Sequence, residues 1–263
     1  MDLGLRGKVA LVSASSKGLG RAIAEELAAE GANLVMCARG EDALRQAAES
    51  IRKSSGVTVV EVVADVSEQA GIDRVAHAAL AKLGKVDVLV TNSGGPPAGT
   101  FDTTSPEAWK AAVDVLLTSA VELIRAVLPG MKQRRFGRIL NVTSITVKQP
   151  VENLILSNAL RAAVTGMART LASETAPFGI TVNNLLPGYT RTERLTELAD
   201  ATAARGGGTA GDFYARLETE IPARRLGEPR ELAALAAFLA SERAAYITGQ
   251  SIAVDGGWIR GLF

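Results

Sequence analysis

The first residues with a clear chemical capacity are two glycines near the amino terminus, in the stretch SASSKGLGRAIA. Gly18 and Gly20 follow a short apolar run and stand where a helical pattern begins. Glycines at such a point let a phosphate approach the backbone, and the amino end of the helix favours its negative charge. Because the pattern opens the first strand–helix unit of the chain, it predicts a nucleotide-phosphate site.

These glycines need elements that hold them in place, and the sequence supplies a regular series of them. Short apolar runs alternate with longer helical runs, beginning with KVALVSAS and LGRAIAEELAAEG. The apolar runs are nearly continuous in Val, Leu and Ile, which is typical of strands buried on both faces of a parallel sheet. The alternation predicts an α/β fold, a doubly wound parallel sheet in three α/β/α layers, and we expect one domain over residues 1–263.

One segment, residues 190–227, breaks this alternation. It carries helical patches on either side of Gly206-Gly207-Gly208 and directly follows a strand end, where open α/β sheets bind ligands. We interpret it as a substrate lid. The alternative interpretation is an ordinary surface excursion. The length of the segment favours the lid over this alternative.

Composition argues against several classes of function. The net charge of +1 gives no broad electrostatic footprint for nucleic acid or an anionic membrane. Without a signal peptide pattern or an apolar stretch of transmembrane length, we expect a cytoplasmic protein. Cys37 is the one cysteine and lies in an apolar run, and His77 is the one histidine, so we expect no disulfide and no metal site.

Five motifs, in order along the chain, resemble those of the short-chain dehydrogenase/reductase family, in particular its 3-oxoacyl-ACP reductases. They are Ser13–Gly20, Asp65-Val66, Thr91–Gly94, NNLLPGYTRT and YITGQSIAVDGG. The resemblance covers nearly the whole chain and implies a Rossmann-type dinucleotide-binding domain and a homo-oligomer, commonly a tetramer. Ala14 stands where the family loop has its first glycine, and we expect it to reshape the turn slightly.

The resemblance assigns the cofactor to residues spread over these motifs. Asp65 would bond the adenine, and Pro187, Gly188 and Thr192 would lie around the nicotinamide. The predicted set is Ser13, Ser15, Lys17, Gly18, Leu19, Gly20, Arg39, Asp65, Val66, Asn92, Ser93, Gly94, Arg161, Pro187, Gly188 and Thr192.

The end of the second predicted strand indicates which dinucleotide is bound. NAD binders usually place a carboxylate there, whereas this chain reads Cys37-Ala38-Arg39. Arg39 and Lys17 put two cations near a 2′-phosphate with no competing carboxylate, which favours NADP(H). The alternative is that Arg39 only solvates the end of a strand.

The resemblance also implies four catalytic roles, of which one keeps its residue type. Ser144, in NVTSI, corresponds to the serine that bonds the substrate carbonyl. Thirteen residues later the family has a tyrosine as general acid/base, and this chain has Ser157. Four residues further, Arg161 replaces the lysine, and Leu116 replaces the asparagine that anchors a water chain.

These replacements change the expected proton chemistry. A tyrosine phenol has a pKa of about 10, whereas a serine hydroxyl is far less acidic and lacks the reach of the ring. Arg161 stays cationic and can still hold ribose hydroxyls through its planar set of donors. Tyr189, expected near the nicotinamide, and Lys148, on the active-site loop, are alternative proton donors. A residue of the pocket wall and a solvated loop lysine are the respective structural alternatives.

We therefore expect an NADP(H)-dependent oxidoreductase that acts on a carbonyl/alcohol pair of a small molecule with a non-standard proton donor. Ser144 would orient the carbonyl, Arg161 would hold the nicotinamide ribose, and Ser157 or a bound water would complete the polar contacts. The alternative is a catalytically silent NADP(H)-binding protein, a sensor or scaffold. Non-redox chemistry on the same fold, such as elimination or isomerisation, is a third possibility.

Overall fold

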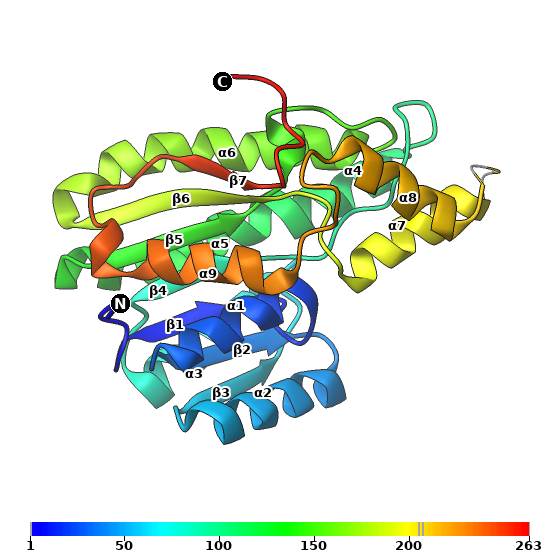
Figure 1. The fold of residues 1–263 in the computed structure, drawn as a ribbon. Helices are drawn as coiled ribbons and strands as arrows, with labels where there is room; N and C mark the ends of the chain where they lie inside the picture. The colour runs from blue at the N-terminus through cyan, green and yellow to red at the C-terminus, as the bar shows by residue number, and fades with distance from the viewer. Residues whose placement is uncertain (1, 205, 207, 263) are drawn as a thin grey trace.

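The computed structural model describes residues 2–204, 206 and 208–262 of the chain. All strand pairs in its sheet are parallel, and the strand order is β3-β2-β1-β4-β5-β6-β7 (Figure 1). The strands are β1 Val9–Val12, β2 Asn33–Ala38, β3 Val59–Val63, β4 Val88–Thr91, β5 Gly137–Val142, β6 Ile180–Pro187 and β7 Ser251–Val254. The strand order reverses between β1 and β4, which is where doubly wound sheets bind ligands.

Helices cover both faces of the sheet, so the predicted three-layer α/β fold is confirmed. Helices α1, α2 and α9 pack on one face, and α3, α5 and α6 pack on the other. The helices and helical turns are α1 Gly18–Ala29, α2 Glu41–Ser55, α3 Gln69–Leu83, α4 Pro106–Val113, η1 Asp114–Thr118, α5 Ser119–Arg134, η2 Ile145–Val147, α6 Ile155–Thr175, η3 Ala176–Phe178, α7 Glu193–Ala204, α8 Ala210–Glu220, α9 Pro229–Ala240 and η4 Glu242–Ala244.

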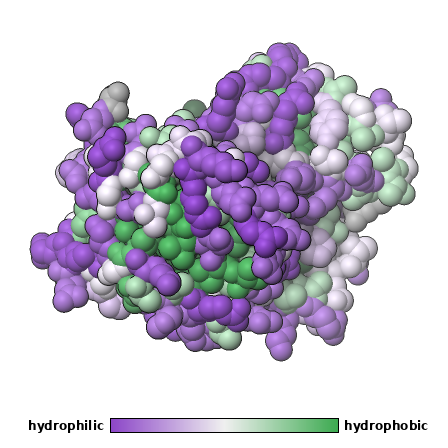
Figure 2. Space-filling model, turned by 90° about the horizontal axis from the view of Figure 1, so that it is seen from below, coloured by the Kyte–Doolittle hydropathy of each residue, from purple (hydrophilic) through white to green (hydrophobic). Residues whose placement is uncertain are grey.

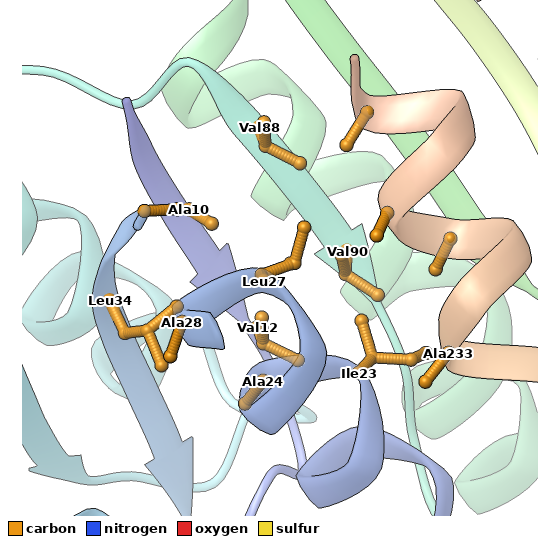
Figure 3. Close-up of a cluster of buried hydrophobic side chains, with 14 of the residues drawn as sticks. Ala10, Val12, Ile23, Ala24, Leu27, Ala28, Leu34, Val88, Val90 and Ala233 are labelled. Carbon is orange, nitrogen blue, oxygen red and sulfur yellow. The ribbon is translucent and has the colours of Figure 1, made fainter. Parts of the chain in front are cut away.

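The central strand β1 shows why the apolar runs are continuous. Ala10 and Val12 point toward the layer of α1, where Ile23 and Leu27 meet them (Figure 3). The intervening Val9 and Leu11 belong to the cluster on the opposite face. Each side of the strand is therefore covered by a helix layer, and every residue of β1 is buried.

Two helices, α7 and α8, occupy the segment predicted to form a lid. They lie beyond the carboxyl ends of the strands, at one side of the molecule (Figure 1). Leu195 and Phe213 anchor them in a cluster with Leu186 of β6 and Trp258. Residues 205 and 207 of this segment lie outside the described residues, and the lid role stays a prediction.

The long helical run between β4 and β5 has an irregular centre. The structure has α4 and α5 joined there by a π-helical turn, η1. Leu116 lies inside this turn, and the Ser119 hydroxyl donates to the Val115 carbonyl 2.6 Å away. A π-turn is rare within helices and is common beside functional sites.

The next features concern the hydropathy of the helices and of the surface. In the part of the chain that the structure describes, no helix is both long and apolar enough to cross a membrane. Seen from the bottom of Figure 1, hydrophilic side chains frame an apolar area (Figure 2). The cytoplasmic location and the homo-oligomer stay predictions.

Candidate cofactor and active site

The turn between β1 and α1 has the shape of a phosphate loop, with one strained residue. Ala14 has φ +47°, a left-handed conformation that costs an L-residue with a side chain about 1–2 kcal/mol. The effect of replacing glycine at this position is therefore strain within the turn. Further along, a Cβ on Gly20 would lie 2.3 Å from the Ala14 carbonyl oxygen, so only glycine allows α1 to approach the turn this closely.

Hydrogen bonds to Asn92, just after β4, and to Cys37 of β2 hold the turn in shape. The Asn92 side-chain amide donates to the carbonyls of Ser13 and Ala14 at 3.3 and 3.2 Å. The Ser13 hydroxyl donates to the Asn92 carbonyl at 2.7 Å, and the Ser15 backbone N–H donates to the Cys37 carbonyl at 3.0 Å. Because Ser13 and Ser15 are fully buried, we interpret them as residues that shape the turn.

The first turn of α1 is open to an anion. Lys17 stands at the N-cap, its side chain does not cap the helix, and the first turn holds no acidic residue. The backbone N–H groups of Gly18, Leu19 and Gly20 therefore have no capping side chain, which suits a phosphate group.

Two charged side chains meet at the carboxyl ends of β2 and β3. Arg39 Nη1 lies 3.9 Å from Asp65 Oδ2, and the Arg39 side chain is 79% exposed. Burial raises the pKa of the Asp65 carboxyl, but hydrogen bonds from Ser67 and the charge of Arg39 lower it more, so it stays below its ordinary value. The sequence reading placed no carboxylate near Arg39, and Asp65 corrects that. An exposed pair at this distance is weak, so Arg39 remains able to bind a phosphate.

The segment after β6 brings the two halves of the predicted site together. A Cβ on Gly188 would lie 2.7 Å from the Asp255 Cα, so the backbone after Pro187 is tightly packed. Thr192 lies at the glycine loop, because a Cβ on Gly18 would be 3.8 Å from its Cγ2 atom. A cleft of about 590 Å³ opens between α1 and the lid, lined among others by Gly18, Arg21, Thr192, Thr196 and Tyr214. The sequence reading missed Arg21, which lies one helical turn after Lys17.

Ser144 and Ser157 lie on neighbouring elements at the carboxyl end of β5. The Ser144 hydroxyl accepts a hydrogen bond from the Thr146 N–H at 3.1 Å, which leaves its proton free to be donated. Ser157 lies in the first turn of α6, which packs against η2, and is 8% exposed. Among the described residues, none hydrogen-bonds the Ser157 hydroxyl. Two serine hydroxyls are thus available on adjacent elements.

Arg161 lies one turn after Ser157 and is fixed to the end of β5. Its Nη1 atom donates to the carbonyls of Val142 and Thr143, each at 2.9 Å. Burial, and after it the charge of Arg194, lowers the pKa of Arg161 to about 10, so the guanidinium is still cationic at neutral pH. Its Nε and Nη2 atoms make no hydrogen bond to the described residues and can serve a ligand.

Leu116 contributes an apolar side chain to the same small cavity as Arg161. It lines a small cavity together with Asn92, Ser93 and Arg161. On its other side it packs with Leu156 and Leu160 of α6. The position therefore offers no anchor for a water chain.

Of the two alternative proton donors, Tyr189 is half-buried and Lys148 is exposed. The Tyr189 ring packs edge-on against Trp258, with ring centroids 5.5 Å apart. Burial, reinforced by the charge of Glu220, raises the pKa of the Tyr189 phenol to about 12. A phenol in this setting is a weaker acid than a free one, which favours the interpretation of Tyr189 as pocket wall. Lys148 is exposed at the end of η2.

Arg194 is a further site residue that the sequence reading missed. It stands in the first turn of α7, and its Nη2 atom donates to the Pro96 carbonyl at 2.5 Å. A Cβ on Gly95 would lie 2.5 Å from the Arg194 Nε atom, so the side chain rests on the loop after β4. The only signal in the sequence was its position two residues after Thr192.

The fold and these motifs define a class of protein. A family model described as Enoyl-(Acyl carrier protein) reductase matches residues 13–259. The chain belongs to the short-chain dehydrogenase/reductase family.

Individual relatives span the whole chain. It is 34% identical to the 3-oxoacyl-[acyl-carrier-protein] reductase of Escherichia coli, over 97% of this chain and 98% of that one. It is 36% identical to the D-beta-hydroxybutyrate dehydrogenase of Cupriavidus necator, over 97% and 99%. The structure of L-sorbose reductase from Gluconobacter frateurii, complexed with NADPH and L-sorbose, matches with a TM-score of 0.94 at 36% identity over all of both chains.

Proposed function

We propose that this protein is an NADP(H)-dependent oxidoreductase that acts on a carbonyl/alcohol pair of a small molecule with a non-standard proton donor. The observation that carries the proposal is the contact between the start of the lid and the glycine loop, where Thr192 lies beside Gly18. This contact brings the segment after β6 to the phosphate-binding turn, while Ser144 follows the neighbouring strand β5 and Arg161 lies on α6. The structure of the related L-sorbose reductase with NADPH supports the choice of cofactor.

The residues present fit a dinucleotide. The glycine cradle at Gly20 and the open first turn of α1 suit its diphosphate, and Lys17 and Arg39 suit a 2′-phosphate. We assign Asp65 to the adenine end and Arg161 to the nicotinamide ribose. When bound, NADPH supplies a hydride to the substrate. The remaining predicted cofactor contacts are Val66, Asn92, Ser93, Gly94, Pro187, Gly188 and Thr192.

Three side chains at the catalytic end act on the carbonyl oxygen of the substrate. The Ser144 hydroxyl donates a hydrogen bond to that oxygen and orients it, because the Ser144 oxygen already accepts a hydrogen bond from the Thr146 N–H. The cationic Arg161 lowers the energy of negative charge that develops there. Ser157 holds a water that relays a proton from bulk solvent to that oxygen, because its own hydroxyl is too weak an acid.

Arg39→Ala is expected to lower the affinity for NADPH about tenfold and to leave NADH binding nearly unchanged. The reason is the loss of one charge-assisted hydrogen bond to the 2′-phosphate, worth about 1.5–3 kcal/mol. Fluorescence titration with each nucleotide measures both affinities. Arg45→Ala is the matched control, because Arg45 is exposed on α2 and pairs with Asp42. Tighter binding of NADH than of NADPH by the wild type would contradict the cofactor assignment.

Ser157→Ala is expected to lower kcat about tenfold or more, and Tyr189→Phe to change it by less than about twofold. Ser157 is proposed to hold the donor water, whereas the Tyr189 phenol has its pKa raised to about 12. The measurement follows NADPH oxidation with a panel of ketones, aldehydes and imines. If neither change lowers kcat on a substrate that is turned over, Ser157 and Tyr189 are both excluded as donors. Tight NADPH binding without oxidation by any panel member would favour the silent nucleotide-binding alternative.

A further inference from the structure

Arg194 reaches from the lid to the loop after β4, across the carboxyl edge of the sheet. Its Nη2 atom donates to the Pro96 carbonyl at 2.5 Å, and its side chain rests on Gly95. The side chain is 35% exposed. The guanidinium is therefore held between lid and loop instead of extending into solvent.

Arg161 borders the same loop segment, residues 92–96. It lines a small cavity together with Asn92 and Ser93, while Arg194 contacts Gly95 and Pro96. After burial, the charge of Arg194 is the second cause that lowers the pKa of Arg161. Two cations thus border the loop after β4.

These two cations lack a buried counter-ion in the part of the chain that the structure describes. Arg161 hydrogen-bonds only to main-chain carbonyls, those of Val142 and Thr143. The carboxylate partner of Arg194 is Glu197, 3.3 Å away on the same helix, and the Glu197 side chain is 61% exposed. Solvent screens such a pair, so it offsets little of the positive charge. Partly buried charge without a partner is costly, and an anionic ligand would relieve that cost.

The negative groups of the proposed cofactor have other partners. The 2′-phosphate is assigned to Lys17 and Arg39, and the diphosphate to the amino end of α1. The nicotinamide end of a dinucleotide carries no negative charge of its own. The positive charge of Arg194, which no group of the cofactor offsets, therefore matches a group on the substrate.

We propose that Arg194 binds a carboxylate carried by the carbonyl substrate, and that the nearby charge of Arg161 strengthens this anion subsite without contacting the carboxylate. A planar guanidinium matches a carboxylate with two parallel hydrogen bonds, and Arg194 spends only one donor on Pro96 and one on Glu197. The substrates are then keto acids and their hydroxy acid products. This inference rests on the proposed function, since it names the substrate class of the same site.

The test compares acids with their uncharged esters on protein loaded with NADPH. The probes are lactate and 3-hydroxybutyrate and their methyl esters, which NADPH cannot reduce at the alcohol carbon, so binding is measured without turnover. Quenching of the NADPH fluorescence reports each affinity. We expect at least one acid to bind about tenfold or more tightly than its ester, the effect of one charge-assisted contact.

Variants assign the preference to Arg194. Arg194→Gln is expected to remove the preference by weakening the acid about tenfold while leaving the ester unchanged. Arg194→Lys should keep part of the preference for the acid, because the positive charge remains while the planar pair of guanidinium donors is lost. Arg216→Gln is the matched control, since Arg216 is an exposed lid arginine that pairs with Glu220.

Three results would overturn the subsite. The first is that neither acid binds more tightly than its ester. The second is that Arg194→Gln weakens the binding of acid and ester equally. The third is that Arg216→Gln removes the preference as well. A prior titration with NADPH alone separates this from the proposed function. Absence of NADPH binding overturns both proposals, whereas NADPH binding without any preference for the acids overturns only the subsite.

Discussion

Replacing Ser157 by tyrosine and Arg161 by lysine together is expected to raise kcat for the reduction of uncharged ketones about 100-fold, the lower end of what a positioned general acid contributes. The two positions are four residues apart on α6, so the new side chains lie on one helix face. A phenol with a pKa of about 10 is within reach of tuning by a neighbouring ammonium group. Steady-state NADPH oxidation measures the gain.

The single variants are the controls for this pair. Ser157→Tyr alone should give a smaller gain, because Arg161 does not readily deprotonate and cannot pass a proton on. Arg161→Lys alone should give none, because the acid is still missing. The Ser157 site is buried, so thermal unfolding must show that the double variant still folds. A folded double variant that binds NADPH and gains no activity would show that the missing acid does not limit the rate.

Gly20→Ala is expected to lower the free energy of unfolding by about 3 kcal/mol and to abolish measurable NADPH binding. The added Cβ would lie 2.3 Å from the Ala14 carbonyl oxygen and 2.6 Å from Asn92 Nδ2. To make room, α1 must leave the turn or Asn92 must release the carbonyls of Ser13 and Ala14. Either movement displaces the backbone N–H groups proposed to bind the diphosphate. Urea unfolding and NADPH titration measure the two effects.

Gly166→Ala supplies the comparison for that variant. Gly166 lies within α6, is exposed, and has nothing within 4 Å of the position of a Cβ. Alanine there should raise the free energy of unfolding by up to about 1 kcal/mol, because glycine is the poorer helix former. A Gly20→Ala protein that is as stable as the wild type and binds NADPH normally would rule out the proposed phosphate loop.

Much of the fold follows from the sequence because burial on both faces leaves a strong pattern. A strand such as β1, covered by helices on each side, must be apolar at every position, and the chain shows this. The glycine loop and the register of Ser144, Ser157 and Arg161 were also predictable, since both depend on local spacing. Their functional roles stay predictions.

The remaining parts of the site depend on contacts between distant segments. Arg194 and Pro96 are 98 residues apart, and no local pattern indicates that their backbones converge. The edge-on contact of Tyr189 with Trp258, which places the phenol in the pocket wall, depends in the same way on the packing of the carboxyl-terminal segment. The pairing of Arg39 with Asp65 depends on β2 lying beside β3.

The π-turn at η1 determines which sides of the continuous helix α4–η1–α5 face α6 and the sheet. An extra residue in a turn rotates everything that follows by about 100° around the helix axis, given 3.6 residues per turn. Before the turn, Ala112 faces Leu156 and Leu160 of α6. After it, Leu123 and Val127 face the sheet. If residues 114–118 formed a regular α-helical turn instead, Ala112 and Leu123 would point to nearly the same side of this helix, so it could pack against α6 or against the sheet but not against both.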